Sequence, residues 1–254
     1  MKIGIIGEGA IGQYVREHIG VPHVILTRAT RLDVEDGCRR VAVAGDLPAD
    51  TELMVDCAGH AALAEHGPTI LERGIGLVTV SLGALADPAV HDRLRFAAEA
   101  GGARLHLASG AIGALDCLQA ARAGGLTDVT YIGRKPPIGW KGSPAEDRID
   151  LDGLATEATH FEGNARQAAT RYPKNANVAA AVALAGTGFE ATRVKLIADP
   201  NITDNIHEVH ATGTFGEFSF RIAGKALPDN PRSSALAAMS VVAAIEKCRT
   251  TISF

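Results

Sequence analysis

Apolar and polar residues follow two different patterns along this chain, and the pattern changes near residue 108. Before that point, short runs of consecutive apolar residues alternate with segments of helical period. Unbroken apolar runs are typical of parallel strands buried on both faces, and their alternation with helices is typical of α/β folds. Strands are expected at Lys2–Ile6, His23–Leu26, Glu52–Cys57, Gly76–Ser81 and Arg104–Leu107, with helices at residues 13–19, Ala61–Arg73 and Pro88–Ala100.

Beyond residue 108, several segments alternate apolar and polar residues with period two. Such alternation suits an antiparallel sheet with one face in water, and it predicts strands at Val129–Arg134, His207–Thr214 and Glu217–Ala223. Alanine-rich helices are expected at Leu115–Ala123 and Asn177–Ala185, while residues 135–163 are expected to be loop-rich. A last helix, Ser233–Lys247, is expected to pack back on the first domain.

These patterns predict two domains. The fold class is α/β, with a Rossmann-type doubly wound parallel sheet over residues 1–108 and a second α+β domain over residues 109–230. Residues 231–254 then return to the first domain as the C-terminal helix.

The first predicted strand leads directly into Gly7-Glu-Gly-Ala-Ile-Gly12, and a helix follows. A strand, G-x-G-x-x-G and a helix in this order form the dinucleotide-binding fingerprint. The first glycine allows the tight turn, Gly9 lets a pyrophosphate approach the backbone, and Gly12 lets helix and strand pack closely. The helix N-terminus offers N–H groups and a partial positive charge to phosphates. Predicted cofactor contacts are Gly7, Gly9, Ala10, Ile11 and Gly12, with Cys57 and Ala58 from the loop after the third strand.

The end of the second predicted strand bears on the choice between NAD and NADP. An NAD-binding chain usually has Asp or Glu there, whereas this one has Thr27-Arg28. Arg28 could stack on the adenine and pair with a 2′-phosphate, or it could be an ordinary surface arginine. Asp33 is the only acid nearby, and it is expected to lie too far along the loop to take the place of that Asp or Glu. The cofactor is therefore predicted as NAD or NADP.

Composition narrows the possible partners and locations. A net charge of −4 argues against a general nucleic-acid-binding protein, and no apolar run reaches the length of a membrane span. The first residues are expected to form a strand rather than a secretory leader. Its four cysteines are scattered without metal-ligand spacing, which is typical of reduced, mostly buried thiols in a cytoplasmic protein. No metal site is expected.

Three segments of the second half of the chain carry candidate chemistry. In one of them, Asn230-Pro-Arg-Ser-Ser234, Arg232 could pair with a substrate carboxylate or simply lie on the surface. Tyr172-Pro-Lys-Asn-Ala-Asn177 precedes a helix, so its amides either cap that helix or hold a substrate carboxylate or cofactor carboxamide. His207 and His210 are three residues apart on a predicted strand and must point to opposite faces. One of them could transfer protons near neutral pH, although a lone strand histidine is more often structural. His60 is a minor candidate.

Together these segments resemble the L-aspartate dehydrogenase family, which oxidatively deaminates aspartate in NAD biosynthesis. The likeness covers essentially the whole chain. It is carried by Gly7–Gly12, Ser109-Gly-Ala-Ile-Gly-Ala-Leu-Asp116, Tyr172–Asn177, Asn205-Ile-His-Glu-Val209, Gly213-Thr-Phe-Gly216 and Asn230-Pro-Arg-Ser-Ser234.

The resemblance implies that His207 is the catalytic histidine and that Ala111 and Asn177 line the nicotinamide site. It also implies a homodimer formed through the sheet of the second domain. Candidates for binding the substrate carboxylates are Lys174, Arg232 and the Ser109-Gly110 backbone. Rival hypotheses are a related dehydrogenase or reductase acting on dihydrodipicolinate or homoserine, and a non-catalytic dinucleotide-binding redox regulator.

Overall fold

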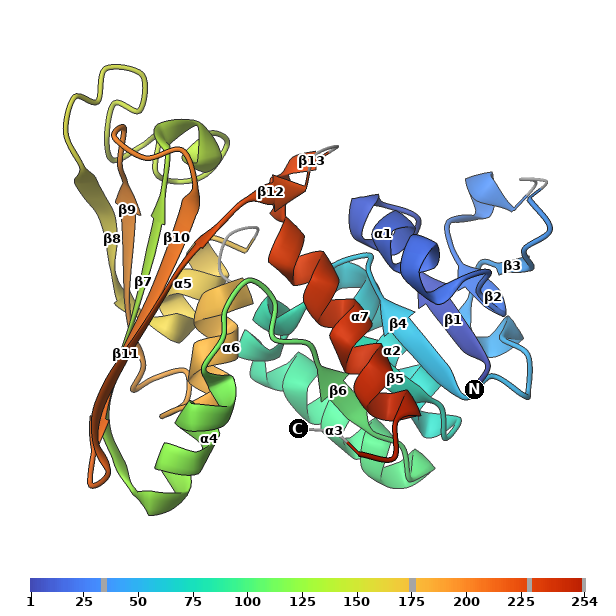
Figure 1. Cartoon of the computed structure of the whole chain (residues 1–254). Helices are drawn as coiled ribbons and strands as arrows, with labels where there is room; N and C mark the ends of the chain where they lie inside the picture. Colours follow the sequence, from blue (N-terminus) through green and yellow to red (C-terminus); the bar gives the residue numbers. More distant parts are fainter. Residues whose placement is uncertain (33–35, 174–176, 228–229, 253–254) are drawn as a thin grey trace. The chain divides into compact units, whose positions relative to one another are not determined.

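The computed structural model describes residues 1–32, 36–173, 177–227 and 230–252 (Figure 1). The chain divides into two compact units. Unit 1 comprises Met1–Ala108 and Ala237–Phe254, and unit 2 comprises Ser109–Leu236. The first boundary falls at the residue that the sequence pattern indicates, and the C-terminal return begins later than residue 231.

Unit 1 is built on a six-stranded parallel sheet in the order β3-β2-β1-β4-β5-β6. This order confirms the Rossmann-type doubly wound class. Strands are added outward from β1 to β3 on one side and from β4 to β6 on the other, so the switch point lies between β1 and β4. A ligand of such a sheet binds at the carboxyl ends of those two strands. The strands are β1 (Ile3–Ile6), β2 (Val24–Leu26), β3 (Arg40–Val41), β4 (Leu53–Asp56), β5 (Gly76–Thr79) and β6 (Leu105–Leu107).

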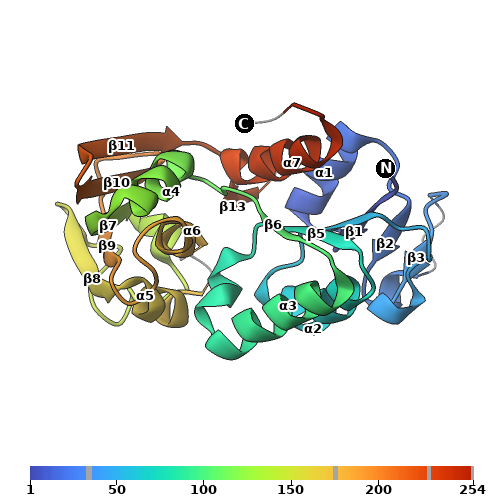
Figure 2. The same ribbon diagram turned by 90° about the horizontal axis from the view of Figure 1, so that it is seen from below.

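Helices cover both faces of this sheet, and Figure 2 shows α1 and α7 on one face and α2 and α3 on the other. Val241 and Ile245 of α7 belong to the same apolar core as Ile3 and Ile5 of β1. The last helix therefore completes the core of unit 1. The helices are α1 (Ala10–Ile19), α2 (His60–Glu72), α3 (Pro88–Gly101) and α7 (Ala235–Arg249), with short 3-10 turns η1 (Ala29–Arg31), η2 (Ala44–Asp46) and η3 (Leu82–Ala86).

Unit 2 is built on a five-stranded sheet in the order β11-β10-β7-β9-β8. The expected antiparallel sheet is wrong in one respect, because β7 and β9 pair in parallel while the other neighbours are antiparallel. The sequence pattern does not predict β8, β9, β12, β13 or α5, and β13 includes Ser233, where the last helix is expected to begin. The elements are β7 (Leu126–Lys135), β8 (Ala158–Asn164), β9 (Arg193–Ala198), β10 (Asn205–Gly213), β11 (Gly216–Gly224), β12 (Ala226–Leu227), β13 (Asn230–Ser234), α4 (Leu115–Gly124), α5 (Ala165–Arg171), α6 (Asn177–Ala185) and η4 (Pro137–Trp140).

The two faces of this sheet differ. In Figure 1 the helices α4, α5 and α6 all lie on one side of it. The register pairs His207 of β10 with Gly133 of β7, so His207 shares a face with Tyr131 and Lys135. His207 is buried and His210 is exposed, which confirms that the two histidines point to opposite faces.

Candidate active site

The glycines of the first loop are required for three different reasons. Gly7 has φ +88°, and a Cβ built on it would lie 2.8 Å from the Ala58 Cβ. A Cβ on Gly12 would lie 2.5 Å from the Gly7 carbonyl oxygen, so helix and loop could not pack as they do. Gly9 has an ordinary φ of −78°, and a Cβ there would meet nothing within 4 Å. The fold itself does not require a glycine at position 9, and the open space beside it is what the close approach of a pyrophosphate would need.

The space beside this loop fits a dinucleotide. Gly9 precedes α1 and provides no side-chain cap, so the first N–H groups of the helix are available for an anion. A cavity of about 690 Å³ adjoins the loop at the carboxyl ends of β1, β2 and β4. Four of the residues predicted to contact the cofactor, Gly7, Gly9, Cys57 and Ala58, line this cavity, while Ala10 and Ile11 form the first turn of α1.

Arginines line the far part of the same cavity. Arg28 and Arg31 both contribute to its wall, and across the described part of the chain neither guanidinium forms an ion pair. Glu8 also lines it, but Arg40 pairs with this carboxylate at 2.7 Å and thereby lowers its pKa. Two cations are thus available to a 2′-phosphate. Asp33 lies outside the described residues.

A buried carboxylate shapes the loop after β4. Asp56 accepts hydrogen bonds from the Thr79 hydroxyl at 2.7 Å and from the Ala58 N–H at 3.0 Å. Burial raises the pKa of Asp56 and also raises the pKa of the neighbouring Cys57 thiol. Asp56 therefore ties together the carboxyl ends of β4 and β5, and Cys57 offers a neutral surface to the cavity.

In unit 2, His207 is held by a buried tyrosine. The Tyr131 hydroxyl lies 2.8 Å from His207 Nδ1, and both side chains are at most 4% exposed. Burial, and secondarily the charge of Lys135, lowers the pKa of His207 to about 3. The expectation that this histidine titrates near neutrality is therefore wrong. His207 is a neutral imidazole at physiological pH.

Sequence reasoning missed Tyr131 and Lys135. The Lys135 ammonium lies 5.0 Å from the centroid of the Trp140 ring, and burial lowers its pKa to about 8. Burial raises the pKa of Tyr131, which keeps its hydroxyl protonated. The two residues are four apart, a spacing that puts both on one face of a strand, but the predicted strand Val129–Arg134 ends one residue before Lys135. The pairing that brings His207 to that face depends on tertiary structure.

The other residues predicted to bind the substrate or the nicotinamide lie in several elements of unit 2 or outside the described residues. Ser109, Gly110 and Ala111 precede α4 in unit 2, and the last two are buried. Asn177 is the first residue of α6 and is half-buried. Lys174 lies outside the described residues, and Arg232 lies in β13 with its side chain not described. In the Ser109–Asp116 segment, Ala114 adopts φ +59°, a left-handed conformation that is unusual for alanine.

Other predicted features concern cysteines, metals and membranes. All four thiols are free, but Cys117 is exposed and the others are half-buried, so the expectation of mostly buried thiols is wrong. No helix in the described ranges is long and apolar enough to cross a membrane. Nor do these ranges contain a cluster of three potential metal ligands.

Comparison with known proteins gives a consistent result for both units. Residues 116–248 match the family model for the C-terminal domain of aspartate dehydrogenase, and residues 7–108 match that for the NAD-binding domain of homoserine dehydrogenase. An L-aspartate dehydrogenase of Ruegeria pomeroyi is 53% identical, over 97% of this chain and 92% of its own. That of Pseudomonas aeruginosa is 46% identical over 96% of each chain.

Solved structures point to the same family as the sequence comparisons. The crystal structure of aspartate dehydrogenase from Thermotoga maritima superimposes with a TM-score of 0.81 at 28% identity, covering 100% of this chain and 99% of that one. A hyperthermophilic archaeal homoserine dehydrogenase in complex with NADPH reaches a TM-score of 0.61 at 12% identity, which shows a shared fold alone. The chain belongs to the L-aspartate dehydrogenase family.

Proposed function

We propose that the protein oxidises L-aspartate with NAD or NADP, giving iminosuccinate and then oxaloacetate and ammonia. The observation that carries the chemistry is the neutral His207 imidazole, hydrogen-bonded to Tyr131 and influenced by the Lys135 charge. A dinucleotide-binding edge in unit 1 supports the redox half of the reaction.

Residues of unit 1 hold the cofactor, which supplies the hydride acceptor when bound. The Gly7–Gly12 loop and the N-terminus of α1 take the pyrophosphate, since Gly9 leaves room there and the helix N–H groups are uncapped. Arg28 and Arg31 take the adenosine end. Ala111 and Asn177 are proposed to adjoin the nicotinamide, on the basis of the family resemblance.

His207 acts on water in the hydrolytic half of the reaction. With Nδ1–H donated to the Tyr131 oxygen, Nε2 keeps its lone pair. As a water oxygen bonds to the imine carbon of iminosuccinate, Nε2 takes the water proton. Nε2 then passes this proton to the imine nitrogen, which gives a carbinolamine. The remaining hydroxyl proton moves to the same nitrogen, the carbon–nitrogen bond breaks, and ammonia leaves as the carbonyl forms. In the reverse direction His207 donates the proton first.

Lys135 is proposed to pair with a substrate carboxylate. Its positive charge is one of the two causes that lower the pKa of His207. A carboxylate placed on Lys135 would neutralise that charge and make His207 a stronger base when substrate is present. Lys174, Arg232 and the Ser109-Gly110 backbone are the candidates for the second carboxylate.

The test measures the formation of reduced nicotinamide by its absorbance. The substrates are aspartate, homoserine and the reduced form of dihydrodipicolinate, each tested with NAD and with NADP. We expect turnover with aspartate. Turnover only with another substrate would make this chain a related dehydrogenase. Dinucleotide binding without any turnover would favour the redox regulator.

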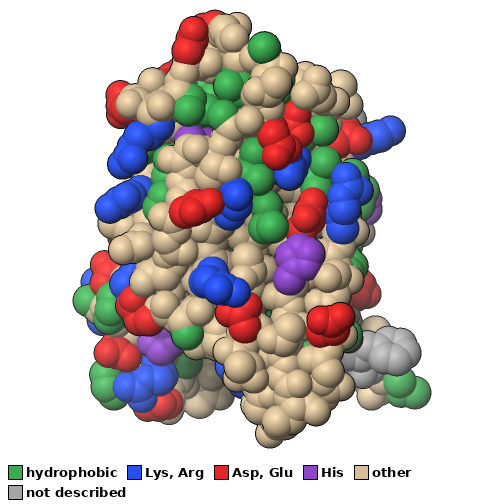
Figure 3. Space-filling model, turned by 90° about the vertical axis from the view of Figure 1, so that its left-hand side faces the viewer, with side chains coloured by type: hydrophobic (Ala, Val, Ile, Leu, Met, Phe, Trp, Pro, Cys, Tyr) green, Lys and Arg blue, Asp and Glu red, His purple; other side chains and the backbone are tan. Residues whose placement is uncertain are grey.

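We also propose that the protein is a cytoplasmic homodimer formed through the uncovered face of the unit 2 sheet. Figure 3 shows this side of the molecule, with apolar side chains among charges of both signs. Ile132, Glu208 and His210 alternate with the buried residues of β7 and β10. Light scattering measures the assembly, and an Ile132→Asp variant should shift it toward monomer. The four free cysteines support the proposed cytoplasmic location, because structural disulfides are rare in that reducing compartment.

A further inference from the structure

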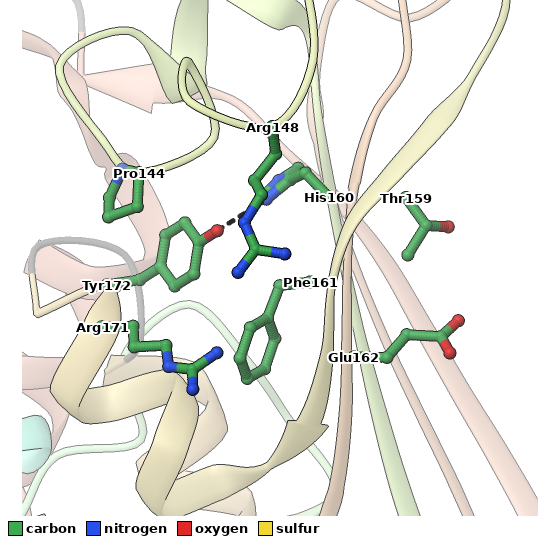
Figure 4. Close-up of a pocket in the computed structure, with 8 residues that line it drawn as sticks. All are labelled: Pro144, Arg148, Thr159, His160, Phe161, Glu162, Arg171 and Tyr172. Carbon is green, nitrogen blue, oxygen red and sulfur yellow. Dashed lines mark hydrogen bonds between the residues drawn. The ribbon is translucent and has the colours of Figure 1, made fainter.

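A second polar pocket lies in unit 2, bounded by the loop after Trp140, by β8 and by the end of α5 (Figure 4). Its volume is about 390 Å³. Arg148 enters it from the loop, and Arg171 enters it as the last residue of α5. Both side chains are exposed, and neither guanidinium has an ion-pair partner in the part of the chain that the structure describes.

The inner wall of this pocket is polar as well as aromatic. Tyr172 is 3% exposed, and its hydroxyl lies 3.1 Å from His160 Nδ1. Burial raises the pKa of Tyr172, and the charges of Arg148 and Arg171 both oppose that rise, so both cations act on this hydroxyl. Figure 4 shows the Arg148 guanidinium above the Phe161 ring and the Arg171 guanidinium to the left of it. Two cations and a phenol thus face one small hollow.

The negative groups nearby do not cancel this charge. Glu162 contributes to the lining, but Lys195 pairs with it at 3.2 Å, and in Figure 4 it lies across β8 from the arginines. Asp147, next to Arg148 in the chain, is the other acid that acts on Tyr172. His160 adds no charge near neutral pH, since burial and the Lys135 charge lower its pKa to about 4. The net charge around the hollow is positive.

We propose that this pocket binds a small doubly charged anion, a dicarboxylate or a phosphate. Arg148 and Arg171 would each hold one charged end, and the Tyr172 hydroxyl would donate a third hydrogen bond. Guanidinium groups suit both ligands because their planar donors match carboxylate and phosphate oxygens. The site does not depend on the proposed function, because His207, Tyr131 and Lys135 are not among its lining residues.

The single tryptophan of the chain can report on this pocket. Trp140 is fully buried, and its ring contacts the inner wall, with centroids 4.3 Å from His160 and 6.1 Å from Tyr172. Its indole N–H donates to the Ile197 carbonyl at 2.9 Å, which fixes the ring. An anion beside Tyr172 would change the electric field on this fixed ring and hence its emission.

The experiment titrates the purified full chain with malonate or with inorganic phosphate, at constant ionic strength set by chloride. Trp140 fluorescence and calorimetry are recorded for the wild type and for three variants. Arg148→Ala and Arg171→Ala each remove one proposed ligand. Arg104→Ala is the matched control, since Arg104 is also exposed and without an ion pair among the described residues but lies in unit 1.

We expect saturable binding of at least one anion, weakened about fivefold or more in each pocket variant and unchanged in Arg104→Ala. A response to malonate alone identifies a dicarboxylate site, and one to phosphate alone identifies a phosphate site. Binding that is absent from the wild type, or equal in all variants, overturns the proposal. So does a rise in the KM for aspartate that parallels the loss of binding, because the pocket would then belong to the substrate site.

Discussion

The two units build their parts of the chemistry by different physical means. In unit 1 the cofactor edge consists mainly of backbone: glycines without a Cβ, an uncapped helix end and the carboxyl ends of parallel strands. In unit 2 the proposed reactive groups are side chains, the buried His207 and Tyr131 and the half-buried Lys135. Burial shifts the pKa of each, and the Lys135 charge also lowers the pKa of His207. Substitutions should therefore act through shape in unit 1 and through proton affinity in unit 2.

His207→Ala gives the sharpest test of this contrast. Turnover should fall by about 10²–10⁴-fold, because the proton acceptor for water is lost, while dinucleotide affinity stays the same. Steady-state kinetics and a fluorescence titration with the reduced cofactor measure the two quantities. His210→Ala is the control, since His210 is exposed on the other face and bonds to Ser219 at 2.8 Å. Equal activity in both variants would remove the histidine from the mechanism.

Gly9→Val should produce the opposite result in unit 1. The added side chain meets no protein atom near its Cβ, so the melting temperature should hardly change, yet binding of either dinucleotide should weaken roughly tenfold or more. Gly12→Ala is the matched comparison. Its Cβ would collide with the Gly7 carbonyl, so it should cost about 1–3 kcal/mol of stability. Unaltered dinucleotide affinity in Gly9→Val contradicts the loop's assignment.

This contrast also explains how much the sequence predicts. Six residues of the first loop specify a turn, a close approach and a helix start locally, so the Rossmann-type sheet and its cofactor edge follow from the pattern alone. The site of unit 2 depends on which strands pair, and period-two alternation does not specify a partner. Residues 135–163 contain few apolar positions, so Trp140 and the start of β8 were hidden in a predicted loop.

Strand β9 was missed for a different reason. Its residues 193–198, Arg-Val-Lys-Leu-Ile-Ala, alternate polar and apolar side chains only over the first few positions. The last three residues form a continuous apolar run. The burial of His207 could not be predicted either, because it requires the packing of several elements. Its consequence, a pKa of about 3, reverses the expectation of a titrating histidine. Local signals therefore identify the residue, and only the fold sets its protonation.

Tyr131→Phe should lower turnover about tenfold without altering dinucleotide affinity. The variant removes the partner of His207 Nδ1, so the imidazole no longer has a fixed tautomer or orientation. Nitrogen chemical shifts of His207 distinguish this effect from simple loss of packing, since they report which ring nitrogen carries the proton. An unchanged tautomer together with unchanged turnover would show that Tyr131 is structural only.

Lys135 should make stability depend on alkaline pH. Its pKa is about 8 in the folded chain and 10.5 ordinarily, so between these values the unfolded chain binds more protons. The free energy of unfolding should therefore gain up to about 1.4 kcal/mol per pH unit from this residue as pH rises through the window. Urea unfolding between pH 7 and pH 10 measures it. Lys135→Met should lack this component, and an identical slope in both proteins would refute it.

Arg28→Ala should have the smallest effect. It tests a part of the unit 1 cofactor edge where the choice between NAD and NADP depends on side chains rather than on backbone. NADP carries a 2′-phosphate that NAD lacks, so the variant should weaken NADP binding about fivefold and leave NAD binding unchanged. The loss is modest because Arg28 is exposed and Arg31 lines the same cavity. Removing both arginines should enlarge it. Titration of the reduced cofactors is the measurement, with Arg104→Ala as the charge control. Equal losses for both cofactors would mean that Arg28 contacts the adenosine they share, and that NAD and NADP are not distinguished here.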